Sequence, residues 1–196
     1  MSHTRHRLRA VAGLAVLITT FSACGTSGDD GPSGAVGGHN SSDVEFATQM
    51  IPHHAQALSM VDMTEGRDLS PEARSLVTAI GAAQAPEIEQ MEEWLREWGE
   101  SVPETTSPMD SMDHEDMGPM SGMMSDSQMD SLEEASSSAF ERMWMTMMIR
   151  HHRGAIEMAQ AELEAGMHPG ALGMARDIVV TQQGEIDQMR SLLTRG

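Results

Sequence analysis

The sequence predicts an all-α protein, a four-helix bundle built from two repeated helical hairpins. Residues 50–60 read Met-Ile-Pro-His-His-Ala-Gln-Ala-Leu-Ser-Met, and residues 148–158 read Met-Ile-Arg-His-His-Arg-Gly-Ala-Ile-Glu-Met. The offset of 98 residues then continues without a gap as far as the pair Leu95 and Leu193. No segment alternates apolar and polar residues over a useful length, so no strand is expected. A duplicated helical unit with one His-His pair in each copy accounts for these observations.

The chain is strongly acidic and rich in methionine. Among its 196 residues, 30 Asp and Glu outweigh 12 basic residues, all of them Arg, and the formal net charge is −18. The phosphates of a nucleic acid would be repelled by such a protein, so nucleic acid is not an expected partner. The charge attracts cations, although a solvated acidic surface is the more common reason for it. The 20 Met residues are unusual and require an explanation.

Residues 1–23 have the pattern of a signal peptide. Three Arg within residues 5–9 precede a short apolar run at 10–18, which is too short for an ordinary transmembrane helix. The stretch before Cys24, the only cysteine, resembles a bacterial lipoprotein signal. We therefore expect lipidation at Cys24 and a membrane-anchored protein on the extracytoplasmic face. The alternative is a plain secreted protein with a free thiol.

The first hairpin is expected at residues 43–99. Residues 24–42 precede it as a flexible tether, because Gly, Ser, Asp and Pro there bury too little apolar surface to become ordered. The first helix is expected at about 43–65, with a capping box between Ser42 and Glu45. Pro52 lies inside this helix and indicates a bend just before the histidines.

The second helix of this hairpin is expected from Pro71 to Trp98. Ser70 has the position of an N-cap, Pro71 suits the first helical position, and Gly99 suits the end.

Residues 100–130 have no helical or strand period and are crowded with Ser, Asp, Gly and Met. We expect this connection to be disordered in the absence of a ligand. The second hairpin is expected at 131–196, with a capping box between Ser131 and Glu134, one helix ending near Ala165 and another running from Pro169 to Leu193. Four helices with one long connection form a recognised type of bundle.

The His-His pairs lie on apolar helix faces between methionines. On a heptad grid, Met50, His53 and Met60 share one seam that faces the bundle interior, and the second copy repeats the pattern. Imidazole and soft thioether sulfur together favour copper, particularly Cu(I). Buried histidines and core methionines without a metal are the alternative explanation. The candidate metal ligands in the helices are His53, His54, His151, His152, Met50, Met60, Met148 and Met158.

The partner helices bring polar residues to the same depth of the repeat. Metal-bound histidines usually donate their other ring N–H to a carboxylate or carbonyl. Solvated side chains or simple bridges between helices are equally open explanations. The candidate residues that would support the histidines in this way are Glu87, Glu185, Gln84 and Gln182.

Exposed thioethers in the 100–130 connection add nothing to a core and are liable to oxidation. Outside the cytoplasm they still offer soft sulfur to Cu(I), whereas thiols would be captured as disulfides. The spacing resembles the Met-rich loops of bacterial copper-resistance proteins, and a low-complexity spacer or a contact surface is the alternative. The candidate ligands are Met109, Met112, His114, Met117, Met120, Met123 and Met124.

Two motifs, each present in both copies, carry a family resemblance. Met-Ile-x-His-His-x-x-Ala, followed by Gln-x-x-Glu-Ile-x-Gln-Met, resembles a bacterial family known as domain of unknown function 305, over residues 43–194. The resemblance implies a ferritin-like helical bundle in a secreted or lipid-anchored protein. Some relatives with Met-rich segments are associated with copper binding and copper tolerance.

We therefore expect a non-enzymatic copper-binding protein that sequesters or delivers copper, with a copper-exporting or copper-oxidising protein as a possible partner. No catalytic residue is identified. A ferritin-like di-iron oxidoreductase is one alternative, but such centres use Glu-x-x-His on two helices, and no Glu stands three residues before any of the four helix histidines. A non-metal envelope adaptor is the other alternative.

Overall fold

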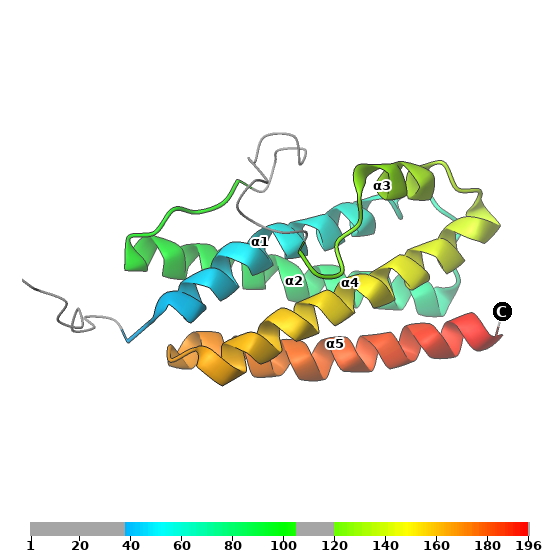
Figure 1. The fold of residues 1–196 in the computed structure, drawn as a ribbon. Coiled ribbons are helices and arrows are strands. Elements are labelled where there is room, and N and C mark those ends of the chain that lie inside the picture. Colours follow the sequence, from blue (N-terminus) through cyan, green and yellow to red (C-terminus); the bar gives the residue numbers. More distant parts are fainter. Residues whose placement is uncertain (1–37, 105–119, 196) are drawn as a thin grey trace, which may run out of the picture. The chain divides into compact units, whose positions relative to one another are not determined.

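The computed structural model describes residues 38–104 and 120–195, and these two ranges contain helices and no strand (Figure 1). The helices are α1 (Ser41–Asp62), α2 (Pro71–Trp98), α3 (Asp126–Glu133), α4 (Ser137–Ala165) and α5 (Pro169–Arg195). The all-α bundle of two hairpins is confirmed: α1 pairs with α2, α4 pairs with α5, and α1 packs against α4. The expected signal peptide and Cys24 lie outside the described residues. In the described ranges, no helix is long and apolar enough to cross a membrane.

The start of α1 differs from the expected one. Asn40 is the N-cap, and its side chain accepts hydrogen bonds from the backbone N–H groups of Ser42 and Asp43. In return the Asp43 carboxylate accepts from the N–H of Asn40 at 2.6 Å. The capping box is therefore Asn40 with Asp43, and the predicted box of Ser42 with Glu45 is wrong. The helix continues through Pro52 as far as Asp62.

The second helix agrees with its prediction. Ser70 Oγ accepts from the N–H of Ala73, Pro71 is the first helical residue, and the helix ends at Gly99 with φ of 78°. A left-handed residue at a helix C-terminus is most easily a glycine.

The end of the connection is ordered, contrary to the expectation for residues 100–130. The short helix α3 begins after Ser125, whose capping partner is Gln128, and α4 begins at Ser137 rather than near Ser131. The reason is apolar burial: Met124 is 1% exposed and Leu132 is 0% exposed. These two side chains join the core of the bundle, and this burial offsets the entropy lost on ordering a polar segment.

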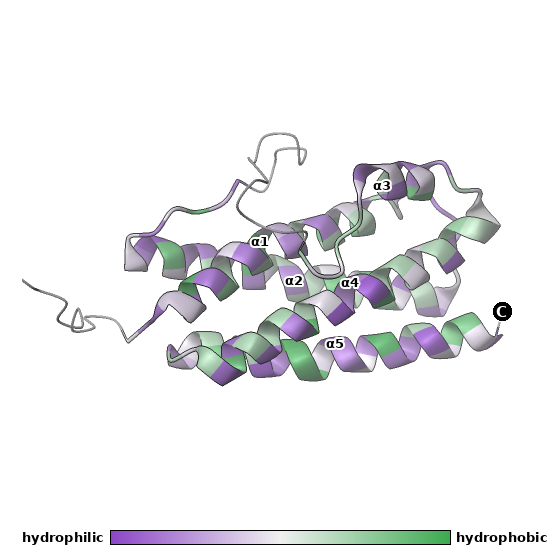
Figure 2. Cartoon of the chain, viewed as in Figure 1, coloured by the Kyte–Doolittle hydropathy of each residue, from purple (hydrophilic) through white to green (hydrophobic). Residues whose placement is uncertain are grey.

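Apolar and polar residues are interspersed along each long helix (Figure 2), and the buried apolar ones recur at spacings of three and four residues. The apolar faces form two clusters, which we name after one member each. The Trp144 cluster includes Ala57, Met60, Leu76, Val77, Ile80, Met124, Leu132, Phe140, Trp144, Met148, Ile186 and Met189. The Phe46 cluster includes Phe46, Met50, Ile51, Ile88, Met91, Trp94, Leu95, Ala155, Ala159, Ala171, Ala175 and Ile178.

A polar layer separates the two clusters. Along every long helix, the residues of this layer come after the members of one cluster and before the members of the other. The layer consists of His53, His54, Gln84, Glu87, His151, His152, Gln182 and Glu185.

The two copies of the repeat are related by an approximate two-fold axis. Residues at equivalent positions lie in opposite clusters: Met50 is in the Phe46 cluster, whereas Met148 is in the Trp144 cluster. Met91 and Met189 follow the same rule. With such an axis, equivalent residues of the two copies can contact one another only near the middle of each copy. The residues at that middle are the histidines.

Candidate metal site

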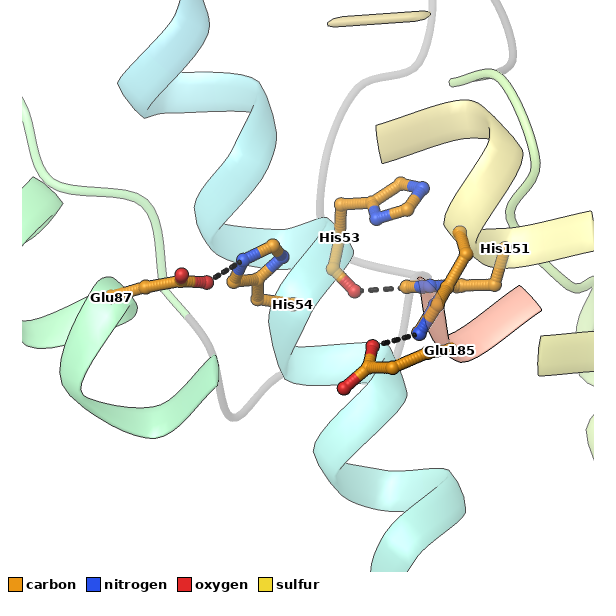
Figure 3. A network of polar contacts seen from close by, with 6 residues as sticks. His53, His54, Glu87, His151 and Glu185 are labelled. Carbon is orange, nitrogen blue, oxygen red and sulfur yellow. Dashed lines mark hydrogen bonds and ion pairs between the residues drawn. The ribbon is translucent and has the colours of Figure 1, made fainter. Parts of the chain in front are cut away.

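His53 and His151 meet in the centre of the bundle (Figure 3). Their ring centroids are 3.8 Å apart, with planes tilted by 38°. Both side chains are fully buried, as are those of His54 and His152. The long separation in sequence is thus closed by the contact between α1 and α4.

Backbone carbonyls determine which nitrogen of each central ring carries hydrogen. His53 Nε2 donates to the carbonyl of Ser121 at 3.1 Å, and His151 Nε2 donates to the carbonyl of His53 at 2.9 Å. A carbonyl only accepts, so Nε2 must be the protonated nitrogen, and Nδ1 of the neutral ring carries a free lone pair.

Both central rings are neutral at physiological pH. Burial, reinforced by the neighbouring His54, lowers the pKa of His53 to about 3. Burial also lowers the pKa of His151 well below its ordinary value, with a further contribution from His53. Neutral imidazole is the form that binds a metal ion.

His54 and His152 turn away from the central pair toward the partner helices. His54 Nε2 lies 2.7 Å from Glu87 Oε2, and His152 Nε2 lies 2.7 Å from Glu185 Oε2 (Figure 3). The Glu185 side chain is 8% exposed and that of Glu87 is 23% exposed, so the pair in the second copy is better shielded from water. Carboxylate–histidine pairs of this kind orient metal ligands, and they also link helices.

Several polar atoms of the layer lack a hydrogen-bond partner. Within the described residues, Nδ1 of all four histidines is buried without one. The same holds for both amide atoms of Gln84 and for Oε1 of Gln182, so neither glutamine supports a histidine in the way that the sequence predicted. Buried polar atoms are rarely left unpaired, and each such case requires an explanation such as a bound ion or water.

The predicted thioether ligands occupy the apolar clusters on both sides of the layer. Met50, Met60 and Met148 are fully buried, and Met158 is partly buried against the Phe46 cluster. Of the candidates in the connection, Met124 belongs to the Trp144 cluster, while Met120 and Met123 are half-buried. The others, Met109, Met112, His114 and Met117, lie outside the described residues.

Ser121 is a site residue that the sequence did not reveal. Its carbonyl holds His53, although it comes from the connection and is distant from the repeat in sequence. The only available signal was a difference between the copies, since Gly154 stands where the first copy has Gln56. Gly154 allows the backbone of Ser121 to approach, as described below.

The donor set is soft and uncharged at its centre. Among the described residues, no group of three or more His, Cys, Asp and Glu side chains is arranged to hold a metal ion. What the layer offers is imidazole Nδ1 lone pairs, with thioethers in the adjoining clusters. Imidazole and thioether donors fit a late transition-metal ion better than they fit an oxygen-preferring ion.

The chain is similar to a described family and to solved structures. The family described as "Domain of unknown function (DUF305)" matches residues 43–193. A DUF305 fragment from Deinococcus radiodurans is 34% identical, with a TM-score of 0.68, and the match covers 81% of this chain and 99% of that one. A protein from Streptomyces coelicolor described as "putative secreted protein DUF305" is 32% identical, with a TM-score of 0.69, and the match covers 79% of this chain and 93% of that one.

Structures of a protein named CopM share the same fold. The Cu(II)-bound form is 27% identical, with a TM-score of 0.65, and the match covers 78% of this chain and 96% of that one. The Cu(I)-bound form is 28% identical with a TM-score of 0.63, at the same coverage. Silver-bound and metal-free forms of CopM match as well. No curated protein sequence matches the chain.

Proposed function

We propose that the chain, which belongs to the DUF305 family, is an extracytoplasmic copper-binding protein that sequesters or delivers copper through His and Met ligands. The observation that carries this proposal is the central pair His53 and His151. Each ring donates Nε2–H to a carbonyl and retains an unpartnered, buried Nδ1. Neutral imidazole is the ligand at the centre of the site, and thioether sulfur is the additional ligand.

A purely structural role explains these rings poorly. A histidine that serves only packing normally satisfies both ring nitrogens when it is buried, because an unpaired polar atom costs about 1–3 kcal/mol. Here four Nδ1 atoms at one depth of the bundle lack partners. Metal ligation would use those lone pairs, and the hydrogen bonds at Nε2 would orient the rings for it.

Copper in its reduced state suits this environment best. The central rings are uncharged and lie between two apolar clusters, where a divalent ion without anionic ligands would be strongly destabilised. A monovalent ion loses less hydration energy, and both imidazole and thioether are good ligands for it. CopM has been solved with Cu(I), Cu(II) and silver bound. The Cu(I)-bound and silver-bound forms support a soft monovalent ion, and the Cu(II)-bound form supports copper in either oxidation state.

The proposed location outside the cytoplasm is supported by the sequence, and delivery to a partner protein is part of the proposal. The signal-peptide pattern at residues 1–23 and Cys24 supports export and a lipid anchor, with secretion without lipid as the alternative. The thioethers of the connection would collect Cu(I) near the bundle, and a copper-exporting or copper-oxidising protein would receive it. The protein has no enzymatic step of its own in this proposal.

A metal titration of purified residues 25–196 tests the proposal. We expect Cu(I) to be withdrawn from a chromophoric chelator, and we expect the double variant His53→Ala/His151→Ala to retain less. His39→Ala is the matched control, because His39 stacks on Trp98 outside the polar layer. Absence of Cu(I), Cu(II) and Zn(II) uptake by the unaltered protein would overturn the proposal in favour of the adaptor. Iron uptake with oxygen consumption would favour the di-iron oxidoreductase.

A further inference from the structure

Residues 120–125, which we call the strap, run between α1 and α4 (Figure 1). The strap forms hydrogen bonds with both helices. Gln56 on α1 holds the backbone of Met124 twice: its Nε2 donates to the carbonyl at 2.8 Å, and its Oε1 accepts from the N–H at 2.7 Å. Arg150 on α4 donates to the carbonyl of Met123 at 2.9 Å. The Ser121 carbonyl binds His53, so the strap contacts the polar layer directly.

The strap backbone touches the backbone of α4. A Cβ atom placed on Gly154 would lie 1.8 Å from the carbonyl oxygen of Ser121 and 2.9 Å from Cα of Gly122. Gly122 itself has φ of 82°, and a Cβ atom there would lie 2.7 Å from the carbonyl oxygen of Arg150. Only glycine permits this approach at either position.

The two copies of the repeat differ at each of the positions that hold the strap. Arg150 replaces Pro52, and Gly154 replaces Gln56. Glu157, which accepts a hydrogen bond from Ser121 Oγ, likewise replaces Ser59. The inward-facing histidines, by contrast, are identical in both copies. A single strap cannot satisfy two-fold symmetry, so the two copies carry different side chains where they bind it.

We propose that the strap is a gate that controls access of metal ions to the central pair of His53 and His151. This inference rests on the proposed function, because it concerns how the same site is filled. Both rings are fully buried, so an ion can reach them only after some segment moves. Within residues 38–104 and 120–195, the strap is the non-helical segment that bonds to His53. Its opening also frees His53 Nε2 from its acceptor.

Opening the strap requires less disruption than separating the helices. Met124 is its one buried residue, and the strap is otherwise held by hydrogen bonds to α1 and α4 and by the close approach of its backbone to Gly154. Segments with few buried apolar contacts open locally at lower free energy than the core. Opening of the strap would therefore uncover His53, and through it the contact with His151, without unfolding the bundle.

Gly154→Ala is the direct test, with Gly173→Ala as its control. Both substitutions add a methyl group to a long helix, but nothing lies within 4 Å of the Cβ position at Gly173. In the metal-free protein we expect amide hydrogen exchange in residues 120–125 to accelerate by about tenfold or more in Gly154→Ala. Modification of His53 and His151 by diethyl pyrocarbonate, followed by peptide mass spectrometry, should accelerate with it. Gly173→Ala should match the unaltered protein in both measurements.

A second pair of variants tests the gate in case Gly154→Ala does not fold. Gln56→Ala removes both bonds to Met124, and Gln49→Ala on the same helix removes only an exposed bond to Glu45. Faster exchange of the strap with unchanged modification of His53 and His151 overturns the gate. These readouts need no metal, so they remain decisive even if the protein takes up no copper. If copper is bound, stopped-flow uptake at the histidines should also be faster in Gly154→Ala.

Discussion

His151 donates its Nε2–H to the backbone carbonyl of His53, the residue at the equivalent position of the other repeat. The bond joins α4 to α1 at 2.9 Å inside the core, and the two rings lie in contact beside it. The same imidazole that would bind a metal ion therefore also holds the two halves together. Metal binding at this imidazole, as proposed, would therefore be coupled to the stability of the contact between α1 and α4.

The two Glu–His pairs should contribute unequally. Glu185→Gln should lower the free energy of unfolding by about 1–3 kcal/mol, because it removes the charged acceptor of a buried donor. Glu87→Gln should cost less, since the Glu87 side chain is 23% exposed whereas that of Glu185 is 8% exposed. Urea denaturation of both variants measures the difference. Equal losses would mean that shielding from water does not set the strength of these pairs.

The same two variants should weaken copper binding. Residues that orient metal-bound histidines typically contribute about 10–100-fold to affinity. We expect a loss in this range for Glu185→Gln, measured by chelator competition at one pH. Glu164→Gln, an exposed position on α4, is the control. Unchanged affinity in Glu185→Gln would assign the His152–Glu185 pair to helix packing alone.

Glu162 should make the protein less stable as the pH rises from 4.5 to 8. Burial, together with hydrogen bonding to Asp43 and its charge, raises the pKa of Glu162 from 4.5 to about 8. Between these values the folded protein binds one more proton than the unfolded chain, so the free energy of unfolding falls with increasing pH. Glu162→Gln should remove this component and gain stability relative to the unaltered protein as the pH approaches 8. Urea denaturation at several pH values measures it, with Glu164→Gln as control.

The central histidines should make the protein less stable as the pH falls, which is the opposite of the effect of Glu162. The pKa of His53 is lowered from 6.5 to about 3, chiefly by burial. Below pH 6.5 the unfolded chain takes up a proton that the folded protein rejects, so stability falls as the pH falls from 6.5 toward 3. His53→Gln should show a shallower loss over this range, whereas His39→Gln should follow the unaltered protein. Identical acid profiles for all three proteins would contradict the burial of a neutral ring.

Substitutions at the start of α1 distinguish the observed cap from the predicted one. Asn40→Ala should destabilise the protein by about 1 kcal/mol, a typical value for loss of an N-cap. Ser42→Ala should have a much smaller effect, because its side chain makes no cap hydrogen bond. Thermal denaturation at neutral pH is sufficient. A larger loss for Ser42→Ala than for Asn40→Ala would restore the box that the sequence predicted.

The observed N-cap differs from the predicted one because of a tertiary contact. Ser42 with Glu45 has suitable local spacing, but Asp43 also accepts hydrogen bonds from the N–H groups of Met167 and His168, at the turn between α4 and α5. Burial raises the pKa of Asp43, yet these bonds and those from Glu162 and Asn40 lower it below the ordinary value. The position of the helix start thus depends on a contact with the turn between α4 and α5, which is distant in sequence.

The ordered strap and α3 have a similar explanation. Residues 120–133 look like the rest of the Met-rich connection when only local period and composition are considered. They become ordered because Met124 and Leu132 enter the Trp144 cluster and because Gln56 holds the backbone of Met124. Neither contact leaves a periodic signal in so short a segment.

By itself, the sequence determined two equivalent helical hairpins, each with a His-His pair on its apolar face. Local periodicity and a gapless repeat suffice for that, because helix formation and the identity of the buried face are short-range properties. Only the tertiary structure decided that His53 and His151 meet, that their partners are the carbonyls of Ser121 and His53, and that the outer histidines pair with Glu87 and Glu185. These contacts depend on how helices distant in sequence cross, and the register of that crossing is set by packing of the whole core.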